Sequence, residues 1–382
     1  MKFDYNFKNY DFKLVIYMVI LNVLGVLIMA SAINASDIKD PQVVRQIMGS
    51  FAGFTVCILI SMIDYRFILK QANLIYLFSV LMLLGVKIYG TASGHGAVRW
   101  IQVPVLGQVQ PAEFVKIGLI IFFARYFHKN RERINSLHVI VMAFVFYAIP
   151  ILLVLLQPNL STAIIMTVII AAMVYASNIS FKWIMGVVLI IVPFALIFIY
   201  LFKSGLYDRI PLLQGYQAER IRTFLNPSEN TQTFYQQMYS IMAIGSGQLT
   251  GKGLNNDSIF SVKNGNFLAE EDNDFIFAVI GEEFGFRGSV FIVIMFLLII
   301  LECLIIASKA KKLGGRLVCV GMMAWIGFQT YTNIAVATGI FPNTGITLPF
   351  FSRGASSLIS VYIGLGLVLN VALQRKESGG LI

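Results

Sequence analysis

Residues 274–308 read DFIFAVIGEEFGFRGSVFIVIMFLLIILECLIIAS, an apolar run that begins with Asp274 and includes Glu282, Glu283 and Glu302. As one straight α-helix this run would extend about 50 Å, whereas the hydrocarbon core of a membrane is about 30 Å thick. The run is therefore too long for a single straight crossing. We expect a short helix at its start, followed by the main membrane span.

The rest of the chain is equally apolar. Of its 382 residues, 58% are hydrophobic and 13% are charged, and the mean hydropathy is +0.78. A soluble domain has about 45–50% apolar and about 25% charged residues. We therefore predict an all-α integral membrane protein, one membrane domain over 1–382. Its expected spans, about ten, lie near 14–33, 47–63, 72–90, 111–127, 138–156, 161–178, 183–203, 274–308, 317–340 and 356–374.

Basic residues fall mostly in alternate loops, and such residues are retained on the cytoplasmic side of a membrane. Both termini are therefore expected in the cytoplasm, with an even number of spans. The first apolar run is long enough to span, so we expect it to insert as a helix. We attribute the net charge of +10 to contact with anionic membrane lipids and not to nucleic acid.

This orientation places four polar regions on the extracytoplasmic face: 91–110, 157–160, 204–273 and 341–355. The region 204–273 is a large extracytoplasmic loop, and loops beyond about 12–15 residues are usually functional or disordered. Its aromatic content favours an ordered loop. We interpret QPNLSTA, residues 157–163, as a turn between two helices.

Two pairs of residues lie near the outer face. Glu113 and Lys116 stand at i, i+3 spacing on a helix that enters the membrane. They form either an intrahelical ion pair or part of a substrate path, because ionisable groups inside a membrane usually mark such paths. Arg99 and Trp100 place a cation beside a ring suited to the headgroup region.

Three cations of the large loop are further candidates for the site. Arg220 and Arg222 are either solvated charges or diphosphate ligands, because Arg binds phosphate through paired N–H donors. Lys252 lies in the glycine-rich stretch AIGSGQLTGKGL, residues 243–254, which lacks the GxxxxGK[ST] spacing of a nucleotide-phosphate loop. We instead predict close backbone approaches at its glycines, Gly245, Gly247, Gly251 and Gly253.

Four carboxylates stand before or at the first residue of the long apolar run: Glu270, Glu271, Asp272 and Asp274. From this stretch alone, Asp274 reads as a helix N-cap, because Asp before a helix accepts a backbone N–H and complements the helix dipole. An acid–base role is compatible with capping. A divalent cation such as Mg²⁺ or Mn²⁺ would suit carboxylate and phosphate oxygens, although the spacing alone does not establish a metal site.

Glu282 and Glu283 are a second acidic feature. They lie about 12–14 Å from Asp274 along a helix, too far to share its immediate site. Glu283 and Arg287 have the i, i+4 spacing of an ion pair, and we assign both glutamates mainly to helix packing.

Taken together and in order, seven segments resemble one family. The chain is similar to the shape, elongation, division and sporulation (SEDS) proteins, which include RodA, FtsW and SpoVE. Its short tails favour the elongation-type RodA branch. The matching segments are RWIQ 99–102, QPAEFVK 110–116, QPNLSTA 157–163, YQAERI 216–221, IGSGQLTGKGL 244–254, DFIFAVIGEEFGFRG 274–288 and TGITLPFFSRGASS 344–357.

The resemblance implies a ten-helix glycosyltransferase of the bacterial cytoplasmic membrane. It would polymerise lipid II into peptidoglycan strands on the extracytoplasmic side and release undecaprenyl diphosphate, for cell wall synthesis and cell shape or division. Its partners would be lipid II, the nascent glycan strand and a class B penicillin-binding protein, the transpeptidase. The alternatives are a flippase of the lipid-linked precursor and a scaffold that only recruits the transpeptidase.

The resemblance also implies residue roles. The aspartate directly before Phe-Ile-Phe is the family's catalytic carboxylate, which here is Asp274, and we expect it to act as a general base. The expected substrate or diphosphate contacts are Lys116, Glu113, Arg99, Trp100, Arg220, Arg222, Glu270, Lys252, Ser352 and Ser356.

This chain also departs from the family pattern at several positions. We interpret the departures as tuning of the same reaction, because Asp274 is kept. The departing residues are Ala112, Asn159, Ser161, Ala269, Asp272, Asn273, Arg353 and Ala355.

Overall fold

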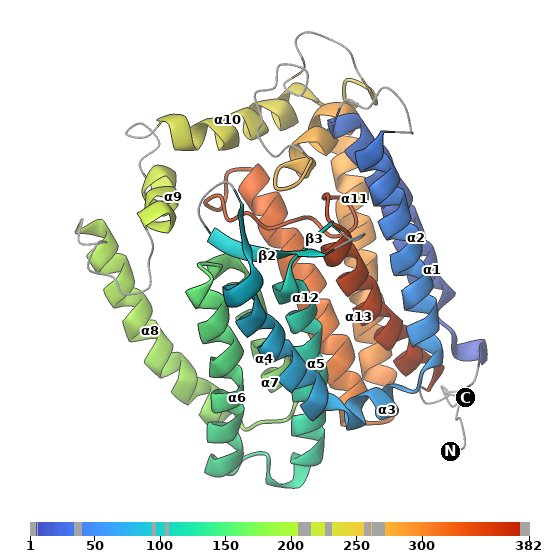
Figure 1. Ribbon diagram of the computed structural model, residues 1–382, viewed down its shortest axis with the longest axis vertical. Coiled ribbons are helices and arrows are strands. Elements are labelled where there is room, and N and C mark those ends of the chain that lie inside the picture. The colour runs from blue at the N-terminus through green and yellow to red at the C-terminus, as the bar shows by residue number, and fades with distance from the viewer. Residues whose placement is uncertain are drawn as a thin grey trace.

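The computed structural model describes residues 5, 7–33, 40–93, 97–103, 107–204, 215–225, 231–255, 261 and 272–374. Within them a bundle of long helices matches the ten expected spans (Figure 1). Six of these helices, α1, α2, α4, α6, α11 and α13, are long and apolar enough to cross a membrane by length and composition. The bounds are α1 Phe12–Ala32, α2 Pro41–Met62, α4 Ala72–Tyr89, α5 Pro111–Lys129, α6 Leu137–Leu156, α7 Leu160–Ala176, α8 Phe181–Lys203, α11 Ile276–Lys309, α12 Leu313–Ala337 and α13 Ala355–Leu373.

Short elements connect the spans. A small antiparallel sheet in the order β1-β2-β3 forms within 91–110, a feature that the all-α prediction overlooked. Its central strand reads AVRWIQV, and the β-branched and aromatic residues of such a run favour strands. The described residues of the large loop include two helices, in agreement with the order that we expected from its aromatic content. The bounds are η1 Phe7–Asn9, α3 Tyr65–Lys70, β1 Thr91–Ser93, β2 Ala97–Val103, β3 Gly107–Val109, η2 Arg131–Arg133, α9 Gly215–Leu225 and α10 Thr231–Ser246.

The long helix α11 is broken at Gly285, which has φ 62° and ψ −162°. This backbone conformation is open to glycine and strained for other residues. A Cβ at Gly285 would also lie 2.3 Å from the backbone N of Gly251. The expected division of the run is confirmed: a half-helix over 276–284 precedes the main span over 286–309.

The glycine-rich segment lies against this break. The backbone N–H groups of Lys252 and Gly253 donate to the carbonyls of Glu282 and Glu283 at 2.9 and 3.0 Å. The predicted close approaches are confirmed at two glycines, because a Cβ at Gly247 or Gly251 would lie about 2 Å from a backbone oxygen of α11. They are wrong for Gly245 and Gly253, which have no such atom within 4 Å.

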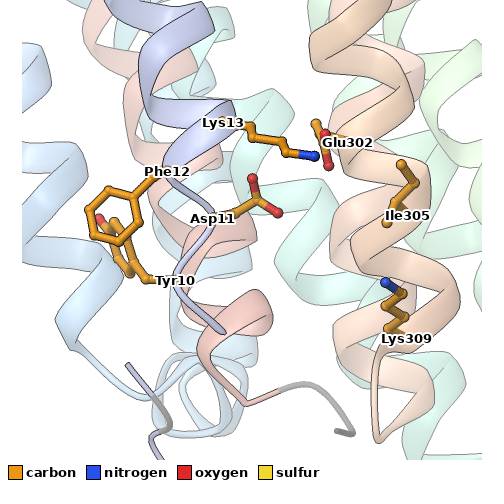
Figure 2. A pocket seen from close by; sticks show the side chains of 7 residues that line it. All are labelled: Tyr10, Asp11, Phe12, Lys13, Glu302, Ile305 and Lys309. Carbon is orange, nitrogen blue, oxygen red and sulfur yellow. The ribbon is translucent and has the colours of Figure 1, made fainter. Parts of the chain in front are cut away.

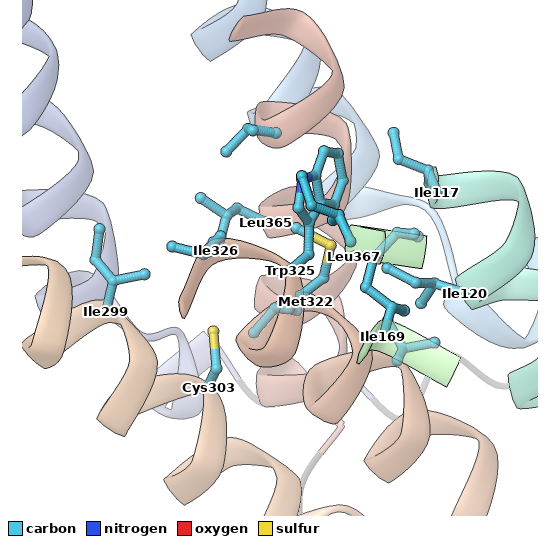
Figure 3. Close-up of a cluster of buried hydrophobic side chains, with 14 of the residues drawn as sticks. Ile117, Ile120, Ile169, Ile299, Cys303, Met322, Trp325, Ile326, Leu365 and Leu367 are labelled. Atoms are coloured by element: carbon cyan, nitrogen blue, oxygen red, sulfur yellow. The ribbon is translucent and has the colours of Figure 1, made fainter. Parts of the chain in front are cut away.

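Helix α12 lies inside the bundle and packs against α5, α7, α11 and α13. Figure 3 shows Trp325, Met322 and Ile326 of α12 among apolar side chains of these neighbours. The three cysteines, at 57, 303 and 319, are buried free thiols, in agreement with a packing role.

The first span, α1, begins at the end of the bundle where the last span, α13, ends. Tyr5 donates from its hydroxyl to the carbonyl of Met62 at 3.0 Å, and Asn370 donates from Nδ2 to the Tyr5 hydroxyl at 3.2 Å. Helix α13 starts at the other end, where segment 341–354, which joins α12 to α13, meets the start of α11. This arrangement agrees with an even number of spans.

Candidate active site

Asp274 lies in a turn over residues 272–275 that leads into the half-helix 276–284. The N-cap residue of α11 is Phe275, and no side chain caps the helix. The interpretation of Asp274 as the cap is therefore wrong. Its half-buried side chain stands just ahead of the helix, at the meeting point of α11, α12 and segment 341–354.

The turn is held from two sides. The fully buried Asn333 of α12 donates from Nδ2 to the carbonyls of Asp274 and Ile346 at 2.9 and 2.7 Å. Ser352 donates from Oγ to the carbonyl of Asn273 at 2.6 Å and accepts from the N–H of Leu348 at 2.8 Å. These contacts fix the backbone that carries the Asp274 carboxylate. They give Ser352 a positioning role beside the substrate contact that the resemblance implies.

Arg220 of α9 reaches the same place. It donates from Nη1 to the carbonyl of Asn343 at 3.3 Å. Gly345 has φ +67°, and a Cβ there would lie 3.3 Å from Asp274 Oδ2 and 3.8 Å from Arg220 Nη1. The structure thus brings the Asp274 carboxylate and the Arg220 guanidinium to the same side of Gly345. Arg222, on the same helix, is exposed.

Glu113 and Lys116 form a buried ion pair. Lys116 Nζ lies 2.9 Å from Glu113 Oε1 and 3.0 Å from Gln329 Oε1, and it stands 4.5 Å from the centre of the Trp325 ring. The intrahelical pair is therefore present. Lys116 is 1% exposed, so its ammonium faces protein groups. Its contact with a diphosphate stays a prediction.

Two amides on α12 connect this pair to Asp274. Gln329 donates from Nε2 to the Thr347 carbonyl at 2.9 Å, and Asn333 holds the next carbonyl back along the chain, that of Ile346. Segment 341–354 therefore lies between the buried ion pair and the Asp274 turn. Sequence reasoning missed both amides, although their i, i+4 spacing inside an apolar span is the signal of an intramembrane polar stripe.

Arg99 attaches the small sheet to the turn between α6 and α7. It donates from Nε to the Gln157 carbonyl at 3.2 Å, and its guanidinium also bonds the Pro158 carbonyl. The side chain of Asn159 caps α7 by accepting from the N–H of Thr162 at 3.2 Å. The interhelical turn is therefore confirmed. Trp100 pairs with Thr91 in the sheet.

Two departures from the family pattern pair with each other. Arg353 Nη1 lies 2.8 Å from Asp272 Oδ2, and the Arg353 N–H donates to the Asp272 carbonyl at 2.9 Å. The charge of Asp272 is therefore offset by Arg353. A third departure, Ser161, donates from Oγ to the Thr344 carbonyl at 2.5 Å. Glu270 and Glu271 lie outside the described residues.

The second acidic feature belongs to the break in α11. Lys252 Nζ lies 2.6 Å from Glu282 Oε1, and Ser31 of α1 donates to a carboxylate oxygen of Glu283. The expected pairing of Glu283 with Arg287 is wrong, because the break at Gly285 removes the helical i, i+4 geometry. Lys252, predicted as a substrate contact, is placed against the half-helix.

The remaining predicted residue, Ser356 at the start of α13, accepts from the N–H of Gln110 at 3.4 Å. This contact joins α13 to the start of α5 near Glu113. In the part of the chain that the structure describes, no group of three or more His, Cys, Asp or Glu side chains is arranged to hold a metal ion. The divalent cation thus stays a prediction.

The whole chain matches known proteins. The family model for the FtsW, RodA and SpoVE cell cycle proteins covers residues 12–377. A relative from Geobacter metallireducens, named "Probable peptidoglycan glycosyltransferase FtsW", is 32% identical over 98% of this chain and 99% of its own length. One of the same name from Haemophilus influenzae is 32% identical over 79% of this chain and 73% of its own length.

Solved structures share the fold. A chain from a peptidoglycan synthase complex that coordinates polymerization and crosslinking has a TM-score of 0.77 at 28% identity and covers 96% of this chain and 99% of that chain. The rod shape determining protein RodA of Thermus thermophilus has a TM-score of 0.68 at 26% identity, covering 96% and 97%. The sequence relatives are named FtsW, so they do not support our assignment to the RodA branch. This chain belongs to the FtsW/RodA/SpoVE family of membrane proteins.

Proposed function

We propose that this chain is a peptidoglycan glycosyltransferase, which joins lipid II disaccharide–peptide units into glycan strands and releases undecaprenyl diphosphate. The family membership and the names of the relatives support the reaction. The observation that carries the proposal is the meeting of Asp274 and Arg220 above Gly345, at the start of the broken helix α11.

The geometry suits a base and a cation. The carboxylate of Asp274 would take the proton from the C4 hydroxyl of the acceptor GlcNAc as this oxygen attacks C1 of the donor MurNAc. Such proton transfer typically contributes about 10²–10⁴-fold. The bond between C1 and the diphosphate oxygen breaks, and Arg220 would stabilise the charge on the leaving diphosphate, since fixed cations aimed at developing charge are effective.

The setting of the reaction is also part of the proposal. Asp274 would face the extracytoplasmic side of the bacterial membrane, with both termini in the cytoplasm. The partner would be a class B penicillin-binding protein, because crosslinking accompanies polymerization in the structurally similar synthase complex. The relatives are named FtsW, and the family model describes a cell cycle protein, which favours a cell-cycle role over the elongation role that we expected from the short tails.

The decisive experiment gives purified protein lipid II in detergent and separates the products on a gel. A polymerase forms glycan strands without a second compartment, whereas a flippase or a scaffold leaves lipid II unchanged. Parallel reactions with Mg²⁺, with Mn²⁺ and with a chelator test the divalent cation. Monodisperse protein that leaves lipid II unchanged under every condition would overturn the proposal.

A further inference from the structure

A pocket opens between α1 and α11 at the end of the bundle where the chain begins. Its volume is about 360 Å³. Glu302, one of its lining residues, lies about 25 Å beyond the break at Gly285 along the main span, so the pocket is far from Asp274. The reaction described above uses none of its residues.

Four charged side chains of both signs line the pocket. Asp11 and Lys13 come from the start of α1, and Glu302 and Lys309 come from the last turns of α11. Figure 2 shows the ammonium end of Lys13 and the carboxyl groups of Asp11 and Glu302 pointing into the space between the two helices. Because the pocket holds both ammonium and carboxylate groups, it can bind a ligand that carries one negative and one positive group.

Apolar surface continues from the pocket along both helices. Phe12 and Ile305 line it and are 64% and 41% exposed. Exposed apolar side chains then recur every three or four residues toward the middle of the bundle. They are Ile16, Val19 and Val23 on α1 and Leu301, Leu297 and Ile294 on α11. A headgroup in the pocket would let its acyl chains lie along these two stripes, because helix ends stand at headgroup depth in a membrane.

We propose that this pocket binds an aminophospholipid, with the phosphate at Lys13 and Lys309 and the primary ammonium at Glu302. The fourth charged residue, Asp11, is 7% exposed and accepts from the N–H of Leu14 as the N-cap of α1. Ionised donors and acceptors form the stronger hydrogen bonds. An anionic headgroup without an ammonium group should bind more weakly, because its negative charge would lie beside two carboxylates. The pocket therefore differs from the basic loops of this chain, which attract anionic lipids of any headgroup.

Native mass spectrometry of the full-length chain tests the proposal. The protein in detergent is titrated with dioleoylphosphatidylethanolamine or dioleoylphosphatidylglycerol, and the dissociation constant of the first bound lipid is measured. Loss of a hydrogen bond to a charged group costs about 1.5–3 kcal/mol. We therefore expect phosphatidylethanolamine to bind about tenfold more tightly or better.

Variants assign the preference to the pocket. Glu302→Gln should weaken the binding of phosphatidylethanolamine alone and so remove the preference. Lys309→Gln should weaken the binding of both lipids, because both carry phosphate. The matched controls Glu132→Gln and Lys182→Gln change exposed side chains on η2 and α8 and should leave the preference for phosphatidylethanolamine unchanged. Equal affinities in the wild type would overturn the proposal without any variant, as would an unchanged preference in Glu302→Gln.

Discussion

Asn333→Ala tests whether the Asp274 turn is held by α12. The substitution removes the Nδ2 donor from the carbonyls of Asp274 and Ile346. Hydrogen bonds between membrane helices contribute about 0.6 kcal/mol each on average, and a buried carbonyl left without a donor costs about 1–3 kcal/mol. We therefore expect the free energy of unfolding to fall by about 1–3 kcal/mol.

The polymerisation rate should also fall, although the protein stays folded. A misplacement of a catalytic group by about 1 Å can cost roughly 10²-fold in rate, so we expect about that loss in lipid II polymerisation. A protein that is stable by about 5–15 kcal/mol remains mostly folded after the loss of stability. The polymerisation rate is measured on a gel, and unfolding is followed with a thiol-reactive dye, because the three cysteines are buried.

Thr332→Ala is the matched control. Thr332 is the preceding residue on α12, and its hydroxyl donates to the Phe328 carbonyl of the same helix at 2.7 Å. It should lose little activity. Equal rates for Asn333→Ala and Thr332→Ala would refute the positioning role of Asn333.

Three other substitutions test separate parts of the site. Gly345→Ala places a methyl group 3.3 Å from the Asp274 carboxylate at φ +67° and strains the backbone by about 1–2 kcal/mol. Its polymerisation rate should fall well below that of Gly245→Ala, whose added methyl meets no atom within 4 Å. Lys116→Met leaves Glu113 as a buried charge and should lower the free energy of unfolding by about 3–5 kcal/mol. Adding Glu113→Gln should restore much of this stability in thermal unfolding, and a double variant no more stable than Lys116→Met would contradict the buried pair. Arg353→Ala removes a half-exposed ion pair and should lower the free energy of unfolding by less than about 1 kcal/mol. A larger decrease in the same unfolding assay would contradict this estimate.

The spans and the break in α11 could be predicted because they depend on length and hydropathy alone. A run of apolar residues longer than the membrane is thick favours a division into two helices, whereas the position of the break at Gly285 required the structure. The same reasoning could not predict the Glu283 contact. It used helical spacing across Gly285, where the helix is interrupted.

The catalytic candidate came from a motif, but its surroundings required the fold. Gln329 and Asn333 carry no motif, and their role appears only when segment 341–354 packs against α12. The pairing of Asp272 with Arg353 likewise joins residues far apart in the chain. Spacing along one helix cannot reveal such contacts, because they depend on how segments separated in sequence meet.

Asp274→Asn tests the central claim most directly. The amide keeps the shape of the side chain but cannot accept the proton of the acceptor hydroxyl. We expect lipid II polymerisation by the purified variant to fall by about 10²–10⁴-fold, with an unchanged melting temperature and a much smaller loss in the neighbouring control Asp272→Asn. Polymerisation by Asp274→Asn at the wild-type rate would contradict the assignment of Asp274 as the general base.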